Sequence, residues 1–409
     1  MTMSQSQIGI ARLGTDLLSP DAFKRMGALM KASLNSSDDS LLRKILRGDE
    51  VDRDSLRNQL PEGRFAEFCA SKLFIESGEW VYSPFSAHLL EEFVIVTDPP
   101  GRPRGTQGEL YLDPLCEAPQ LAKLVIRKPS GHGLDMGCGS GVLSLVLSSF
   151  CEHVTAVDIN PRALEVSRFN SALNNVRNIA ILESDLFSAL KGQQFDHIVF
   201  NSPTNEEGDC YRNLLEAGEP VLTRFFMHLA NHLTPSGYCQ INLAMNDYED
   251  SRFSERLTTW IGAHKLWWVA MICKRLKLKN NRVWKRGWAT FCSGNHLSVE
   301  VDWPYKLLPA AVPAKTLSTL VLRLLENHKQ IISRKQLHHL SWAEEVSYSP
   351  QSRALCLWDV PLVEEVPEEL ISSFSNKKSL SFPTGHDVDL WIDKCLRKGL
   401  LQVPQSLLE

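Results

Sequence analysis

The chain has 409 residues, of which 43% are hydrophobic and 22% are charged, and its formal net charge is -4. This length exceeds the usual limit of one hydrophobic core, so we expect two or three folding units, and the composition excludes a disordered or low-complexity protein. The acidic balance provides no general attraction to polyanions, so binding of a nucleic acid would require a local basic patch.

The cysteines and the N-terminus predict a cellular location. Ten cysteines are scattered along the chain without a C-x-x-C pair, which is typical of reduced cytosolic cysteines and predicts no metal site. No run of eighteen apolar residues occurs, and residues 1–7 lack the basic and apolar regions of a secretory signal. We therefore expect a cytoplasmic protein that does not enter a membrane.

The first part of the chain, residues 1–98, shows helical patterns followed by a hairpin pattern. A helix-start signal lies at residues 19–21, further helices are predicted at 41–46 and near Asp54, and residues 73–82 have a strand, glycine-turn, strand pattern. Helices followed by a small hairpin predict a helical or winged-helix-like N-terminal domain.

A segment rich in proline and glycine, residues 98–105, marks the next boundary, and beyond it strands and helices alternate. Strands are predicted at about 132–137, 154–159, 179–184, 197–201 and 238–244, with helices at about 141–150, 161–175 and 216–232. Repeated strand–helix units predict an α/β fold, a doubly wound Rossmann-like sheet over residues 99–299, with its ligand at the carboxyl ends of the strands.

Two further strands and a third domain follow. Residues 267–273 and 287–292 are expected to pair as antiparallel strands at the end of the sheet. The remaining residues, 300–409, are expected to form a mainly helical C-terminal domain with helices at 316–328 and 388–401.

A glycine-rich turn follows the first strand of the predicted sheet. Gly137, Cys138, Gly139 and Gly141 lie between this strand and a helix, where backbone N–H groups can approach a ligand. Asp135 stands two residues before the first glycine, and a carboxylate there suits a cationic amino group rather than a pyrophosphate. The turn alone is weak evidence, because dinucleotide enzymes use a similar one.

The next two strands also end in acids. Asp158, followed by Ile159, is placed to accept hydrogen bonds from both hydroxyls of a ribose. After it, Asn160 and Pro161 predict an N-cap and a first helical residue. At the end of the third strand, Asp185 suits the exocyclic amine of an adenine and Leu186 its ring face.

These segments, in this order, resemble the class I S-adenosylmethionine-dependent methyltransferases over about residues 110–245. The resemblance implies S-adenosyl-L-methionine as the cofactor. The residues it assigns to cofactor binding are Asp135, Gly137, Cys138, Gly139, Gly141, Asp158, Ile159, Asp185, Leu186 and Asn201. Two alternatives remain open at this point, a Rossmann-like domain that binds no cofactor and a catalytically inactive copy.

The fourth strand ends in Asn201-Ser202-Pro203-Thr204. This sequence resembles the Asn-Pro-Pro-aromatic motif of N-methyltransferases such as the release-factor glutamine, ribosomal RNA guanine and DNA adenine enzymes. The resemblance implies that the Asn201 side chain and the Ser202 carbonyl accept hydrogen bonds from the substrate nitrogen, with Pro203 shaping the turn. A plain strand-ending turn is the alternative.

Two positions depart from this motif. Ser202 replaces a proline, and Thr204 replaces the aromatic residue that would stack on a planar substrate. The second departure favours an aliphatic amine or another small acceptor. In the polar segment that follows, Tyr211 is a candidate for the missing ring and Arg212 for a contact to a substrate carboxylate or phosphate, unless the segment is only a surface loop.

The segment 274–286 has seven basic residues and no acid, with Trp284 and Trp288 close by. It is either an electrostatic footprint for RNA or the solvated turn of the predicted antiparallel hairpin. His197 lies inside a strand and is expected to be a packed or hydrogen-bonded core residue.

Three functions fit these patterns. We expect N-methylation of a small metabolite or amino-acid-derived intermediate, because Thr204 replaces the stacking ring and large flanking domains are available to enclose a small-molecule substrate. The alternatives are an RNA or protein glutamine N-methyltransferase, and a non-catalytic cofactor-binding or interaction module.

Overall fold

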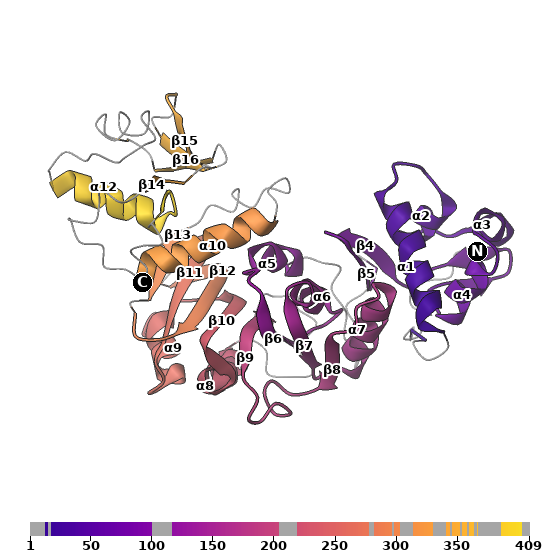
Figure 1. Ribbon diagram of the computed structural model, residues 1–409, viewed down its shortest axis with the longest axis horizontal. Coiled ribbons are helices and arrows are strands. Elements are labelled where there is room, and N and C mark those ends of the chain that lie inside the picture. Colours follow the sequence, from indigo (N-terminus) through magenta and orange to yellow (C-terminus); the bar gives the residue numbers. More distant parts are fainter. Residues whose placement is uncertain are drawn as a thin grey trace. The chain divides into compact units, whose positions relative to one another are not determined.

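The computed structural model describes residues 13–14, 18–99, 117–203, 219–277, 282–296, 298–302, 314–329, 341–343, 346–351, 354–357, 360–363, 366 and 386–402 (Figure 1). The chain divides into two compact units, one made of residues 1–122, 128–241 and 260–262 and the other of residues 123–127, 242–259 and 263–409. The predicted domain boundaries at 98 and 299 stay predictions. No helix among the described residues is long and apolar enough to cross a membrane.

The first unit begins with helices and a small sheet. The helices are α1 (Pro20–Asn35), α2 (Leu41–Leu46), α3 (Arg53–Gln59) and α4 (Arg64–Ala70). The strands β1 (Val51–Asp52), β2 (Ile75–Ser77) and β3 (Trp80–Tyr82) form an antiparallel sheet in the order β1-β3-β2. The predicted helix start is confirmed, because the Ser19 side chain accepts a hydrogen bond from the Ala22 N–H and Pro20 is the first helical residue.

Helix α1 packs closely on α7 (Pro161–Leu173). A Cβ atom at Gly27 would lie 2.0 Å from the Leu173 carbonyl oxygen, so this contact requires a glycine. The Phe23 and Phe169 rings meet edge to face at 5.4 Å. The N-terminal helices therefore share a hydrophobic core with a helix of the α/β sheet.

A second antiparallel pair, β4 (Ser86–Leu90) and β5 (Phe93–Thr97), lies beside α7 (Figure 1). The side chain of Asn170 bonds both backbone groups of Val96, and that of Asn174 bonds both backbone groups of Val94. Asn170 also donates to the Ser140 carbonyl at 2.8 Å. These amides satisfy polar groups of the β5 backbone and attach the glycine-rich turn to α7.

The sheet of the first unit has the strands β6 (Ser130–Met136), β7 (Cys151–Asp158), β8 (Ile179–Glu183), β9 (Phe195–Asn201) and β10 (Leu233–Ala244), in the order β10-β9-β6-β7-β8. In this sheet, β6 to β9 pair in parallel, as predicted. The associated helices are α5 (Ala118–Leu124), α6 (Val142–Ser148), α7 and α8 (Glu219–His232). Parallel pairing of β6 with both β7 and β9 brings the carboxyl ends of these strands to one edge.

The second unit contains the predicted antiparallel pair. Strands β11 (Leu266–Lys277) and β12 (Val283–Ser293) are antiparallel, and β13 (Val299–Asp302) runs parallel to β11. The second unit also contains α10 (Ala314–Lys329), α12 (His386–Arg397) and all but the last two residues of α9 (Phe253–Ile261).

The C-terminal part also contains strands that the sequence patterns missed. They are β14 (Ser341–Trp342), β15 (Val346–Ser349), β16 (Ala354–Leu357), β17 (Val360–Val363) and β18 (Leu401–Gln402). The expectation of a mainly helical segment is therefore incomplete. Strands of two to four residues are too short to show an alternating pattern, which explains the omission.

Candidate cofactor and acceptor site

The polar residues singled out in the sequence gather at one edge of the parallel sheet. Asp135 is the next-to-last residue of β6, Asp158 is the last of β7, and Asn201 is the last of β9. In the strand register, Met136 lies opposite both Val157 and Phe200. The three side chains therefore project from neighbouring strand ends, where open α/β sheets bind their ligands.

The glycine-rich turn leaves space for a ligand at Gly139 and none at Gly141. A Cβ atom at Gly141 would lie 2.6 Å from the Ser167 hydroxyl oxygen, and the residue has a φ of +82°. A Cβ atom at Gly139, where φ is +52°, would meet no atom within 4 Å. Gly141 is thus required by packing against α7, whereas Gly139 presents an open backbone surface.

Asp135 is buried with half of its carboxylate unsatisfied. Its side chain is 1% exposed, Oδ2 accepts a hydrogen bond from the Ser144 hydroxyl at 2.5 Å, and Oδ1 is buried without a hydrogen-bond partner. Burial raises the pKa of this carboxyl group to about 7, which the Ser144 hydrogen bond partly opposes. A buried acceptor without a partner is rare in proteins and fits a bound cationic amino group.

Asp158 connects the second strand to the glycine-rich turn. Its Oδ2 accepts a hydrogen bond from the Gly139 N–H and its Oδ1 one from the Asn160 N–H, both at 2.9 Å. Burial raises the pKa of Asp158, while the backbone hydrogen bonds from Asn160 and Gly139 lower it. Each carboxylate oxygen can accept a second hydrogen bond, so two ribose hydroxyls remain compatible with this geometry.

The residues around Asp158 are ordered by local contacts. Ile159 follows the carboxylate and is half-buried. The buried Cys138 donates its backbone N–H to the Val157 carbonyl at 2.9 Å, and burial raises the pKa of its thiol well above the usual value. Asn160 accepts a hydrogen bond from the Arg162 N–H and caps α7, which confirms its predicted structural role.

The end of β8 is more exposed. Asp185 is exposed and forms an ion pair with Arg224 of α8, with 2.8 Å between Oδ2 and Nη1. Leu186, which follows, has a φ of +48°, and its carbonyl accepts a hydrogen bond from the Ser184 hydroxyl at 2.7 Å. Arg224 was not predicted, because nothing in an amphipathic helix 39 residues away indicates this pairing.

Ser144 is another contact that the sequence analysis missed. A signal was available, because this serine interrupts the otherwise apolar run from Val142 to Leu147 in the helix after the turn. Its hydroxyl is entirely buried and reaches back to Asp135.

The acceptor motif begins at the end of β9. Asn201 and Pro203 are half-buried, and Ser202 is buried. The predicted substrate residues Thr204, Tyr211 and Arg212 lie outside the described residues. The structure therefore places the first three residues of the motif at the same edge of the sheet as Asp135 and Asp158.

His197 is a core residue, as predicted. It is 1% exposed and its Nε2 lies 3.0 Å from the Gln240 side-chain oxygen. Burial lowers its pKa to about 4, so the imidazole is neutral at physiological pH and is hydrogen-bonded within the sheet.

Comparison with known proteins shows the family of this chain. The family described as "Methyltransferase small domain" matches residues 118–257. A protein of Methanocaldococcus jannaschii with the provisional name protein N5-glutamine methyltransferase is 34% identical over 143 residues, which span 32% of this chain and 71% of that protein. The chain belongs to the S-adenosylmethionine-dependent methyltransferases.

Two further relatives of this methyltransferase are similar over shorter segments. The release factor glutamine methyltransferase of Salmonella typhimurium is 39% identical over 26% of this chain and 43% of its own length. The ribosomal RNA small subunit methyltransferase C of Sodalis glossinidius is 33% identical over 37% of this chain and 43% of its own length. This methyltransferase thus spans less than half of the length of each of these two relatives.

The cofactor of the methyltransferase is S-adenosyl-L-methionine, and the geometry of the sheet edge fits it. Asp135 offers a buried acceptor without a partner, and Gly139 leaves its backbone open to a ligand. Among the described residues, no group of three or more His, Cys, Asp or Glu side chains could hold a metal ion.

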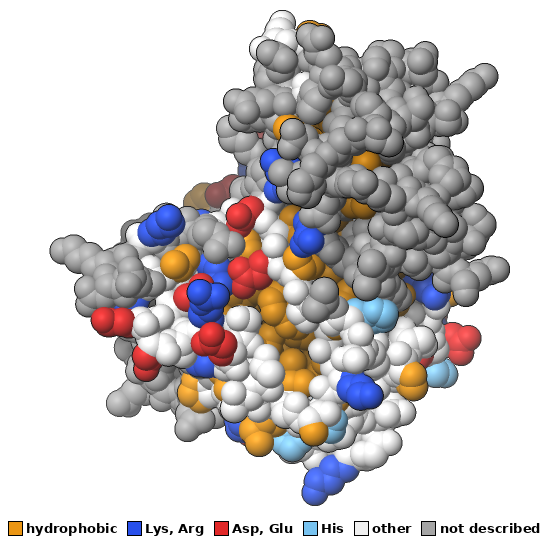
Figure 2. All heavy atoms as spheres, turned by 90° about the vertical axis from the view of Figure 1, so that its left-hand side faces the viewer, with side chains coloured by type: hydrophobic (Ala, Val, Ile, Leu, Met, Phe, Trp, Pro, Cys, Tyr) orange, Lys and Arg blue, Asp and Glu red, His pale blue; other side chains and the backbone are white. Residues whose placement is uncertain are grey.

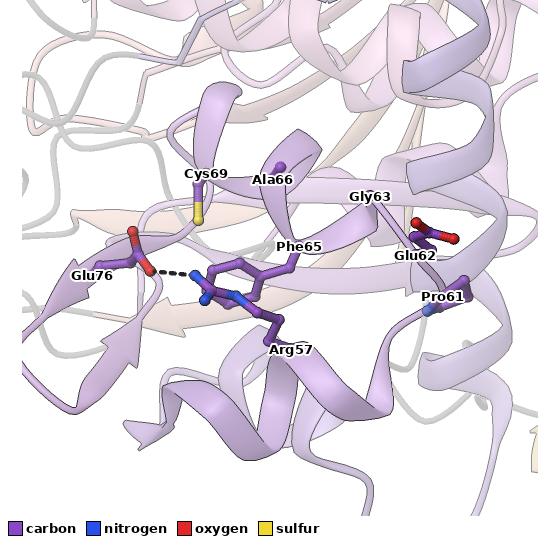
Figure 3. A pocket seen from close by; sticks show the side chains of 8 residues that line it. All are labelled: Arg57, Pro61, Glu62, Gly63, Phe65, Ala66, Cys69 and Glu76. Atoms are coloured by element: carbon purple, nitrogen blue, oxygen red, sulfur yellow. Dashed lines mark hydrogen bonds and ion pairs between the residues drawn. The ribbon is translucent and has the colours of Figure 1, made fainter.

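A separate pocket lies in the N-terminal helices of the methyltransferase (Figure 3). It is lined by Arg57, Pro61, Glu62, Gly63, Phe65, Ala66, Cys69 and Glu76. Arg57 lies 4.7 Å above the Phe65 ring and forms an ion pair with Glu76 at 3.1 Å. None of the predicted cofactor or acceptor residues belongs to this pocket.

Proposed function

We propose that the methyltransferase N-methylates the side-chain amide of a glutamine in a protein substrate. The observation on which this rests is the Asn201-Ser202-Pro203 segment at the end of β9, next to the strand that bears Asp135. Two of the similar proteins named above carry names of glutamine methyltransferases, one of them provisionally. No observation supports the small metabolite that Thr204 suggested, and the names of the relatives favour a macromolecular substrate.

In this proposal the cofactor half of the site orients the methyl donor. Asp135 accepts a hydrogen bond from the amino group of the cofactor, and Asp158 accepts hydrogen bonds from its ribose. Gly137, Cys138, Gly139 and Gly141 bring the backbone close to the cofactor, with Ile159 beside the ribose. At the far end, Asp185 accepts from the adenine amine and Leu186 covers the ring.

The acceptor half holds the substrate nitrogen. The Asn201 side-chain oxygen and the Ser202 carbonyl each accept one hydrogen bond from the amide NH₂ group, which draws the nitrogen lone pair out of conjugation and aims it at the methyl group. When bound, S-adenosylmethionine supplies an electrophilic methyl, whose bond to sulfur breaks and leaves its electron pair on sulfur while the nitrogen forms the new bond to carbon. The nitrogen then loses one proton to solvent.

The basic segment 274–286 is not uniformly available to a phosphate, because Lys274, Lys277 and Arg282 are exposed whereas Lys285 is buried. Lys285 is 3% exposed, and its ammonium group lies 2.7 Å from a Glu300 oxygen and 3.1 Å from an Asp247 oxygen. It is therefore a buried structural charge and not available to a phosphate. Among the coloured residues of the face in Figure 2, acidic and basic side chains are interspersed.

The proposal is tested by locating the transferred methyl group. The methyltransferase is incubated with S-adenosylmethionine labelled in the methyl group and with separate protein, RNA and small-molecule fractions of cells that lack it. We expect label in the protein fraction, recovered as N5-methylglutamine after enzymatic digestion. Label in the RNA or the small-molecule fraction alone would overturn the proposal.

A further inference from the structure

Arg224 of α8 and Asp185 of the turn after β8 form an ion pair across 39 residues of sequence. Their side chains are 42% and 43% exposed. Exposed ion pairs contribute little to the stability of a fold, because water and ions screen them. The stability of the fold therefore gives little reason for this pair.

The turn that bears Asp185 is held in an unusual conformation. Leu186 has a φ of +48°, which side-chain-bearing residues rarely adopt. The Ser184 hydroxyl donates to the Leu186 carbonyl at 2.7 Å and accepts from the Ala189 N–H at 3.1 Å. Strained residues persist only where their surroundings hold them, and they are common at ligand sites.

Helix α8 is fixed to the same turn by stacked rings. The Phe187 ring stacks on that of His232 at 4.4 Å and on that of Phe225 at 5.3 Å. Phe225 is the neighbour of Arg224 in α8, and it is completely buried. The guanidinium group thus extends from a helix that is itself anchored to the turn.

We propose that Arg224 is a positioning residue for the adenine of the cofactor. Its guanidinium group bonds Oδ2 of Asp185 and prevents the carboxylate from turning, so that Oδ1 accepts the hydrogen bond from the exocyclic amine. This inference rests on the role proposed above for Asp185. It adds a residue from α8 to a cofactor site otherwise built from strand ends.

The test measures how well the protein distinguishes adenine from a purine that lacks the amine. Isothermal titration calorimetry is carried out with S-adenosylhomocysteine and with its analogue that has purine in place of adenine. We expect the wild-type protein to bind the adenine compound about tenfold more tightly, the value of one hydrogen bond of ordinary strength. Arg224→Ala lowers this preference to about threefold or less, and Arg224→Lys restores part of it because it keeps a positive charge beside Asp185.

The matched control is Met227→Ala, which removes an exposed side chain from the same helix and leaves the preference unchanged. If Arg224→Ala weakens the binding of both compounds equally, or leaves the binding of both unchanged, the preference for adenine is unaltered. Either result would show a merely structural role for Arg224 and overturn the inference. Asp185→Ala, which removes the acceptor, separates the role of Arg224 from that of Asp185. Loss of the preference in Asp185→Ala with its retention in Arg224→Ala refutes only the role of Arg224, whereas retention in both variants also refutes the role of Asp185.

Discussion

Two regions of the cofactor half of the site are held in different ways. At the ends of β6 and β7, Asp135 and Asp158 accept hydrogen bonds from residues of the adjoining turn and helix, within about twenty residues of sequence. At the end of β8, Asp185 is exposed and its partner Arg224 lies in a different part of the chain. The first arrangement is preorganised by local structure, whereas the second depends on the packing of α8 on the sheet.

The buried half of the site, at the ends of β6 and β7, and the acceptor half at the end of β9 should also respond separately to substitution. Changes in the buried half should alter the binding of the cofactor and the stability of the fold. Changes at the acceptor end of β9 should alter the rate and leave the cofactor bound. The predictions below test this separation, beginning with the largest expected effect.

Replacement of Asn201 by Ala removes the side-chain acceptor for the substrate nitrogen. We expect the rate of methyl transfer to fall at least about a hundredfold, because the nitrogen loses its orientation toward the methyl group. The affinity for S-adenosylhomocysteine, measured by calorimetry, should change less than about threefold, since the buried half is intact. A loss of cofactor binding that parallels the loss of rate would contradict the separation of the two halves.

Two glycines of the turn form a matched pair for measuring stability. Gly141→Ala places a methyl group 2.6 Å from the Ser167 hydroxyl oxygen at a φ of +82°, so it should lower the free energy of unfolding by about 3 kcal/mol. Gly139→Ala meets no atom within 4 Å, so it should cost only about 1 kcal/mol in the cofactor-free protein. Urea denaturation followed by circular dichroism measures both values.

The same pair tests the placement of the cofactor. Gly139→Ala fills the space above the turn, so we expect it to weaken the binding of S-adenosylhomocysteine in spite of its mild effect on stability. Unchanged binding in this variant would show that the cofactor does not approach the turn there.

The pH dependence of cofactor binding reports on Asp135. Burial raises its pKa to about 7, and only the ionised carboxylate favours the cationic amino group. Affinity for S-adenosylhomocysteine should therefore rise about tenfold between pH 6 and pH 8, and Asp135→Asn should flatten this dependence. A wild-type profile that is flat over this range would refute the role of Asp135.

The stability of the cofactor-free protein should depend on pH in the opposite direction. The folded protein binds the Asp135 proton more tightly than the unfolded chain does, because the folded pKa of about 7 lies above the ordinary value of 3.8. The contribution of this group to the free energy of unfolding is thus fully present at low pH and is lost as the pH rises from about 4 to about 7. Comparison of wild type with Asp135→Asn in urea isolates this slope.

Sequence patterns predicted the elements whose causes are local. The parallel strands, the cap residues Ser19 and Asn160, and the antiparallel pair β11–β12 all follow from periodicity or from hydrogen bonds within a few residues. The glycine-rich turn and the acids at the strand ends were recognisable for the same reason, since each stands at a defined place after a strand. The resemblance to a known family then supplied the cofactor.

Only the tertiary structure decided which polar groups meet. Lys285 belongs to a segment that looks uniformly basic in the sequence, yet it is buried between Asp247 and Glu300. Asn170 joins the glycine-rich turn to β5, and Arg224 holds Asp185 across 39 residues. Such contacts depend on how helices and strands pack, and a linear pattern of residues contains no information on the partner of a side chain that lies far along the chain.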